Sequence, residues 1–90
     1  MQVATIELRP IAERLADVDL VPSRSLVSQI FTALKDLIVT MKLRPGELLS
    51  EKEVAEALGA SRTPVREAVI RLEDMGLLEV VPKSGTYVTP

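Results

Sequence analysis

The chain has 90 residues, 11 basic and 13 acidic side chains, and a formal net charge of −2. It contains no Cys and no His, which excludes disulfides, thiolate and imidazole metal sites, and catalysis by a nucleophile–histidine pair. The length fits one small domain, no stretch approaches the ~18 apolar residues of a membrane span, and the acidic balance argues weakly against a nucleic-acid partner.

The net charge is distributed unevenly along the chain. Residues 1–23 carry all of it, whereas residues 24–90 are neutral overall. Between residues 57 and 72, Arg62, Arg66 and Arg71 face only one acidic side chain, so this stretch is positive. An anionic partner would meet the chain there, although a solvated helix face is the simpler interpretation of the same charges.

Residues 1–24 are predicted to form an N-terminal arm that precedes a compact module. Pro10 suits a first helical position, and Ile11, Leu15 and Val18 follow at helical spacing, so the arm contains one candidate short helix. Such a helix is marginal on its own and must dock or fray. Two roles for the arm remain open: a disordered tail, or a segment for self-association through its three apolar residues.

The module, residues 25–90, is predicted to begin with a helix over residues 25–42 that has Ser25 as its N-cap. A turn at Pro45-Gly46 ends this segment, and the apolar pair that follows at residues 48–49 allows only a stub of strand. The predicted inner face of the helix is one apolar stripe, made of Leu26, Val27, Ile30, Phe31, Leu34, Leu37, Ile38 and Met41.

The second helix of the module, about residues 51–58, has the clearest local signal in the sequence. Ser50 and Glu53 have the spacing of a capping box, in which the Ser50 hydroxyl accepts from the Glu53 amide and the Glu53 carboxylate accepts from the Ser50 amide. Gly59 suits a left-handed cap after the last turn. We therefore predict a short helix with both ends fixed locally.

A third helix and a hairpin complete the module. Ser61 or Thr63 is the predicted N-cap of the helix, Pro64 lies in its first turn, and Gly76 ends it. The β-prone segments 77–81 and 86–89 flank a four-residue tip at residues 82–85, so a hairpin is predicted. An isolated hairpin is marginal and must pack on the helices.

The second and third helices, joined by the short turn at residues 59–61, have the pattern of a helix-turn-helix. Arg62 and Arg66 lie four residues apart near the start of the third helix and share one face, where proteins of this kind reach base edges. An arginine fork pairs with guanine O6 and N7, and the Ser61 and Thr63 hydroxyls suit phosphates. We therefore predict a nucleic-acid reading helix.

The hairpin behind this helix would then be a wing. Lys83 lies at its predicted tip, from which a long cationic side chain reaches the DNA backbone or the minor groove. The same positive face would be ordinary solvated surface if the chain bound no nucleic acid.

Several strings of the module carry a family resemblance. They are residues 43–51 (LRPGELLSE), 55–59 (AEALG), 61–68 (SRTPVREA), 76–77 (GL) and 85–88 (GTYV). Together, over about residues 25–89, they resemble the winged-helix DNA-binding domain of the GntR family of bacterial transcriptional regulators, and its FadR-like subfamily in particular.

This resemblance implies a mainly α winged helix-turn-helix with a small β-hairpin. It also implies a homodimer on a palindromic operator in double-stranded DNA, usually as a repressor, in the bacterial cytoplasm. By position, the family's DNA contacts fall on Lys52, Arg62, Thr63, Arg66 and Gly85, with Lys52 contacting a phosphate. Members normally carry an effector domain after the wing, so we expect an isolated domain or a single-domain member, with no small-molecule effector bound within this chain.

Three classes of function fit these features to different degrees. A sequence-specific DNA-binding domain fits best. The alternative is a winged-helix module for protein interaction or assembly, favoured by the net acidity, the apolar arm and the lack of an effector domain. An enzyme fits least, because the carboxylates are scattered or used in caps and no base accompanies the hydroxyls; we expect no cofactor and no metal.

Overall fold

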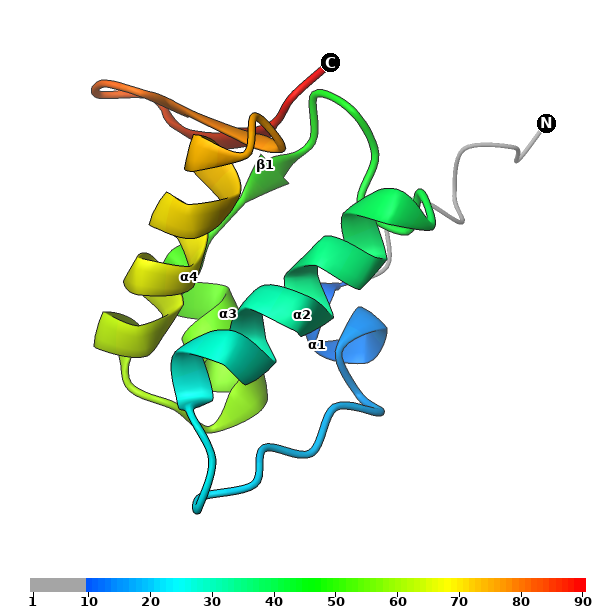
Figure 1. Cartoon of the computed structure of the whole chain (residues 1–90). Coiled ribbons are helices and arrows are strands. Elements are labelled where there is room, and N and C mark those ends of the chain that lie inside the picture. The colour runs from blue at the N-terminus through cyan, green and yellow to red at the C-terminus, as the bar shows by residue number, and fades with distance from the viewer. Residues whose placement is uncertain (1–9) are drawn as a thin grey trace, which may run out of the picture.

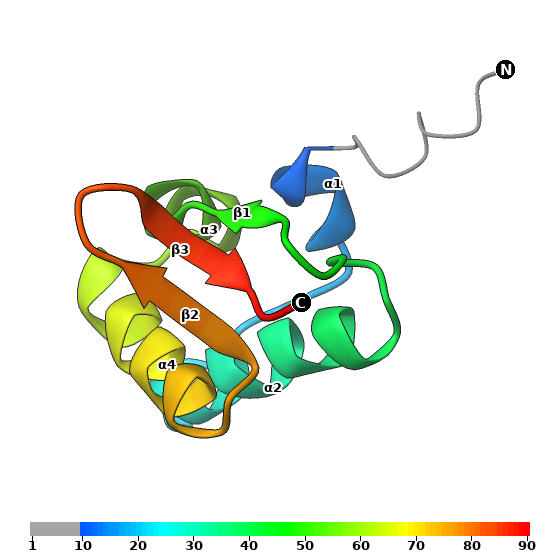
Figure 2. The same ribbon diagram turned by 90° about the horizontal axis from the view of Figure 1, so that it is seen from above.

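The computed structural model describes residues 10–90. Helices and a small sheet form a winged helix-turn-helix, as predicted, with the sheet lying across one end of the helices (Figures 1 and 2). The elements in chain order are α1 (Ile11–Arg14), α2 (Leu26–Val39), β1 (Leu48–Leu49), α3 (Glu51–Leu58), α4 (Arg62–Asp74), β2 (Leu78–Val81) and β3 (Gly85–Val88). No helix among residues 10–90 is long and apolar enough to cross a membrane.

The core lies where α2 packs against α4 and α4 packs against α3. The apolar stripe predicted for α2 supplies its share through Ile30, Leu34 and Leu37, all buried. The other helices and the hairpin add Val54, Ala55, Val65, Ala68, Val69, Leu72, Leu78 and Val88. Amphipathic helices of this kind are held mainly by such burial rather than by their own propensity.

The first long helix is shorter than predicted. It ends at Val39 rather than near residue 42, and the Thr40 hydroxyl donates to the Asp36 carbonyl at the last turn. Met41 then adopts a left-handed conformation with φ of 65°. Its side chain is consequently exposed, so its place in the predicted apolar stripe was wrong.

The helix caps follow the local sequence closely. Ser25 Oγ accepts from the Ser28 amide and Ser50 Oγ accepts from the Glu53 amide, both at 3.2 Å. Gly59 has the predicted left-handed geometry, with φ of 65°. The second half of the capping box is not formed within residues 10–90: the exposed Glu53 carboxylate does not accept from the Ser50 amide.

The wing is a three-stranded antiparallel sheet with the order β1-β3-β2 (Figure 2). The predicted stub β1 pairs with β3, through Leu48 opposite Tyr87. Gly85 lies opposite Val81 inside the ladder, so the tip has three residues, 82–84, rather than the four predicted. The sequence predicted a two-stranded hairpin; the pairing of β1 attaches this hairpin to the start of α3.

The arm is part of the chain's own core. α1 packs on α3, and the side chains of Ile11 and Leu15 are only 9% and 2% exposed. The helix has one turn, with Pro10 as its N-cap rather than its first residue. Neither role left open for the arm fits these residues, because a docked segment is not a disordered tail and buried side chains are not free for self-association; residues 1–9 lie outside the described part.

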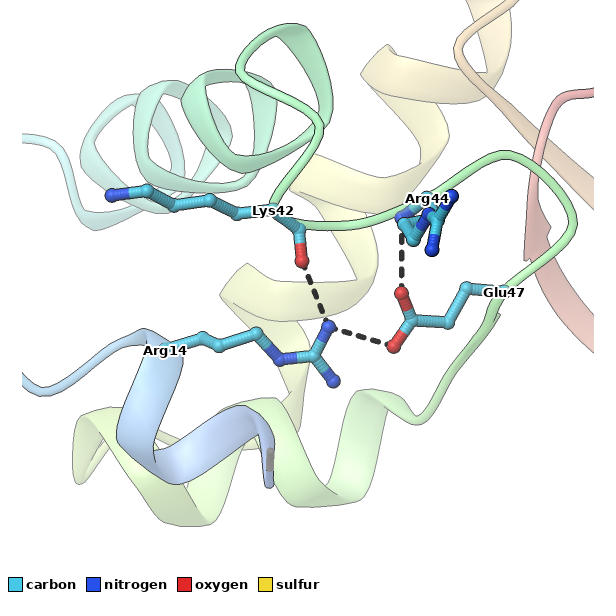
Figure 3. A network of polar contacts seen from close by, with 4 residues as sticks. All are labelled: Arg14, Lys42, Arg44 and Glu47. Carbon is cyan, nitrogen blue, oxygen red and sulfur yellow. Dashed lines mark hydrogen bonds and ion pairs between the residues drawn. The ribbon is translucent and has the colours of Figure 1, made fainter. Parts of the chain in front are cut away.

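A largely buried ion pair fastens the arm to the loop between α2 and β1 (Figure 3). Arg14 Nη1 lies 2.7 Å from Glu47 Oε2 and donates to the Lys42 carbonyl at 2.9 Å. The other Glu47 oxygen accepts from the Arg44 amide. The Glu47 carbonyl also accepts from the Val88 amide. Glu47 therefore connects the loop to the arm through its side chain and to the wing through its backbone.

Candidate DNA-binding surface

The turn between α3 and α4 fixes how the reading helix projects. Gly59 ends α3, and the Ala60 amide donates to the Ala55 carbonyl at 3.0 Å, which closes the turn tightly. Val65 and Ala68 of α4 have no exposed surface. With one face of α4 locked into the core in this way, the opposite face is held toward solvent by the fold itself.

The structure brings the predicted residues of α4 together on that outer face. Arg62, Thr63 and Arg66 are all exposed, and with Glu67 and Ile70 they line a shallow hollow of about 240 Å³. Ser61 is the N-cap by its backbone position, but its side chain makes no capping hydrogen bond, which leaves the hydroxyl available to a ligand. The cluster thus offers two arginine forks and two short hydroxyls at a helix start.

Two members of this hollow were not anticipated from the sequence. Ile70 is 48% exposed, one turn beyond Arg66, whereas its neighbour Val69 is buried. No role was predicted for Ile70, although its four-residue spacing from Arg66 places it on the same outward face. An exposed apolar side chain here suits a thymine methyl group, and the Glu67 carboxylate suits a cytosine amino group.

The first turn of α3 borders the same surface. Lys52 is exposed there. Its neighbour Glu51 forms an ion pair with α4, because Arg66 Nε lies 3.5 Å from Glu51 Oε1. This contact between two helices was not predicted from the sequence. The sequence predicted that Arg66 faces DNA and indicated no partner for Glu51, and only the tertiary packing of α3 on α4 places the two side chains together.

The tip of the wing projects toward the same side of the molecule as the start of α4 in both views (Figures 1 and 2). Lys83 is exposed at this tip and has a φ of 65°, a conformation that costs a side-chain-bearing residue energy. A three-residue hairpin loop commonly contains one residue in this conformation, and here that residue carries the exposed cation of the tip.

Gly85 has a structural reason to be glycine. Its φ is 151°, and a Cβ there would lie 2.8 Å from Leu48 Cδ1. The absent side chain thus lets β3 pass close to β1 at the base of the tip. The site residues therefore divide into those that offer chemistry and one that shapes the wing.

A helix-turn-helix with arginines at the start of its second helix, followed by a hairpin that projects to the same side, defines a winged helix-turn-helix domain. Residues 26–88 match the family model "Bacterial regulatory proteins, gntR family". The chain therefore belongs to the GntR family, and these residues are its DNA-binding domain. It is a regulator domain and not an enzyme.

Curated relatives agree with this membership. The HTH-type transcriptional regulator in the TAR-I ttuE-ttuC' intergenic region of Agrobacterium vitis is 38% identical over 89 residues, covering 97% of this chain and 52% of that regulator. The HTH-type transcriptional repressor RspR of Escherichia coli K12 is 43% identical over 67 residues, covering 74% of this chain and 29% of the repressor. The chain thus spans about half or less of these relatives.

Solved structures share the fold. A GntR family member from Pseudomonas syringae pv. tomato DC3000 matches with a TM-score of 0.75 and 33% identity, covering 88% of this chain and 35% of that one. The DNA-binding domain of AraR, in complex with operator ORX1, matches with a TM-score of 0.68 and 28% identity, covering 78% of this chain and 87% of that one.

Proposed function

We propose that this chain binds double-stranded operator DNA sequence-specifically, as the reading head of a bacterial transcriptional regulator in the cytoplasm. The observation that carries the proposal is the exposed cluster of Arg62, Thr63 and Arg66 at the start of α4, with the wing tip on the same side. The structural match to AraR, whose domain is in complex with an operator, supports it.

Each site residue has a proposed role that follows from its chemistry. Arg62 and Arg66 present guanidinium forks to guanine in the major groove. Lys52, Ser61 and Thr63 contact phosphates and set the position of the helix on the duplex. Lys83 reaches the backbone or minor groove from the wing. Gly85 permits the tip to take this position.

The proposed assembly on DNA is a homodimer on a palindromic operator, with repression as the outcome. The charge of the module supports a dimer. Residues 24–90 carry no net charge, so nonspecific attraction to phosphates is weak and affinity depends on correct contacts, of which two copies of the domain make twice as many. Repression is supported by the relative RspR, which is named a repressor. That no small-molecule effector binds within this chain stays a prediction.

The competing hypothesis of a protein-interaction module is weakened at one point. It relied in part on an apolar arm for self-association, and Ile11 and Leu15 of that arm are buried inside the protomer. The net acidity that also favoured it lies in residues 1–23, away in the sequence from the exposed arginines of α4.

The test is selection of binding sites from random double-stranded DNA at about 150 mM salt, followed by fluorescence anisotropy titrations with the recovered site. We expect a palindromic site bound at least about 10³-fold more tightly than random DNA, a ratio typical of specific binders. Failure to enrich any sequence, with equal binding to all duplexes, would overturn the proposal.

A further inference from the structure

The ion pair between α3 and α4 has unequal partners. Glu51 is the first residue of α3, and its side chain is 17% exposed, whereas the Arg66 side chain is 65% exposed. The carboxylate is therefore largely enclosed, while the guanidinium lies on the open face of the reading helix. An enclosed side chain has fewer rotamers open to it than an exposed one, so the glutamate is the more restricted partner of the pair.

The ion pair involves Nε of Arg66 and leaves the two terminal nitrogens of its guanidinium available for DNA. The carboxylate lies against Nε, at 3.5 Å. A guanidinium carries five N–H donors in one plane, one on Nε and four on the two terminal nitrogens. With Nε turned toward Glu51, both terminal nitrogens remain available, and this pair can donate to guanine O6 and N7 together.

We infer that Glu51 is a positioning residue for base readout, which holds Arg66 in the orientation that reads a guanine; this inference rests on the proposed DNA-binding function. Without its partner, the flexible guanidinium can turn to any nearby phosphate, since phosphates are the more abundant anions on DNA. Glu51 also places a negative charge beside the duplex, which disfavours binding that lacks the correct base contact. It therefore acts on discrimination more than on affinity.

The chain offers a matched control in the same helical turn. Glu51 and Glu53 both lie in the first turn of α3. Glu53 is exposed and makes no ion pair within residues 10–90. Glu51→Gln and Glu53→Gln remove the same charge from the same helix end. Any effect on the helix dipole is common to both variants, although Glu53 faces the α1 side of α3, where it lines a hollow with Pro10 and Ile11. The difference between the variants therefore reports on the Arg66 contact and on the charge beside the reading helix, and the Arg66→Ala background separates these two effects.

The experiment measures dissociation constants of the whole 90-residue chain at one salt concentration. The probes are the selected operator, the operator with one base pair changed at the position where Arg66→Ala loses discrimination, and random duplex. We expect Glu51→Gln to reduce discrimination at that position about 10-fold and Glu53→Gln to leave it unchanged. In an Arg66→Ala background, Glu51→Gln should cause no further loss of discrimination.

Equal discrimination by the two Gln variants, or a full additional loss from Glu51→Gln in the Arg66→Ala background, overturns the inference. Thermal unfolding checks that each variant is folded. If Glu51→Gln is unfolded at the assay temperature, Glu51→Asp replaces it, because it keeps the charge but shortens the reach; it is expected to weaken discrimination, and an unchanged value overturns the inference. An unmutated chain that does not distinguish operator from random DNA refutes the proposed function itself.

Discussion

Two arginines of this domain each pair with a glutamate, and the contrast between the pairs separates structure from function. Arg14 lies 2.7 Å from Glu47, with side chains 9% and 22% exposed, between the arm and the α2–β1 loop (Figure 3). Arg66 lies 3.5 Å from Glu51 on open surface. The first guanidinium is enclosed by its own chain, whereas the second keeps most of its donors for a partner.

The regions that contain these two ion pairs differ in the same way. Around Arg14, Ile11 and Leu15 are buried and the loop is connected to β3 by backbone hydrogen bonds. Around Arg66, the neighbouring side chains are exposed and line an open hollow. Changes near Arg14 should therefore lower stability and spare specificity, and changes near Arg66 should do the reverse.

The largest effect is expected from Leu15→Ala, which empties a buried site beneath α1. Loss of a fully buried leucine costs about 3 kcal/mol of unfolding free energy, since transfer and cavity terms add. Urea unfolding followed by circular dichroism measures it. Discrimination between operator and random DNA by the folded fraction should not change; an unfolding free energy equal to that of the parent would mean that the arm does not dock.

Arg66→Ala tests the opposite region. Removal of a base-reading arginine should weaken operator binding by about 2 kcal/mol and relax base preference at one position. Because the site is exposed, the unfolding free energy should stay within about 0.5 kcal/mol of the parent. Anisotropy titrations with operator and random duplex provide the measurement, and a variant that binds both like the parent would show that α4 is not the reading helix.

Arg14→Ala should have the opposite effect to Arg66→Ala: lower stability with unchanged base preference. It leaves the largely buried Glu47 carboxylate unpaired, so we expect a loss of about 2 kcal/mol in stability, below the range for a fully buried pair because Glu47 keeps some contact with water. Base preference should be unchanged when binding is measured well below the melting temperature. A relaxed base preference with unchanged stability would show that Arg14 contributes to DNA reading rather than to the stability of the fold.

Gly85→Ala should cost about 1 kcal/mol of stability, because the residue has a φ of 151° and a Cβ there would crowd Leu48. The double variant with Leu48→Ala removes the crowding atom and should recover part of the loss. Thermal unfolding of the two variants checks this, and an equal loss in both would assign the effect to backbone strain alone.

The smallest effect is expected from Lys83→Ala at the tip of the wing. Removing a cation that binds a phosphate should reduce the slope of log affinity against log salt by about 1 and weaken binding to all DNA sequences alike. Titrations at several salt concentrations measure the slope. A change confined to one base position would show instead that Lys83 reads sequence.

Local signals in the sequence predicted much of the fold. The Ser25 and Ser50 caps, the left-handed Gly59 and the outward arginines of α4 were predicted correctly, because each depends on residues within about one turn. The end of α2 was placed too late, since the apolar Met41 continued the helical spacing although the chain turns back at Thr40. Cap geometry and side-chain spacing are properties of short segments, and the sequence contains them directly.

The missed features all join segments far apart in the chain. Arg14 and Glu47 are separated by 33 residues, and Glu51 and Arg66 by 15; their pairing exists only once α1 docks on α3 and α3 packs on α4. The charge distribution along the sequence indicated no partner for any of these four side chains. The burial of Ile11 and Leu15 was missed for the same reason, because an amphipathic turn does not reveal which surface will cover it.

If this near-neutral domain reads DNA through the start of α4, it must bind operator far more tightly than random duplex. A competition titration at about 150 mM salt measures this difference: labelled operator, bound by the unmutated chain or by Arg66→Ala, is displaced either with unlabelled operator or with unlabelled random duplex. For the unmutated chain, we predict that random duplex must be added at a concentration at least about 10³-fold higher than unlabelled operator to give the same displacement. For Arg66→Ala, this ratio of concentrations should be lower by about 10-fold or more. Equal potency of both competitors against the unmutated chain would show that the domain does not read DNA sequence.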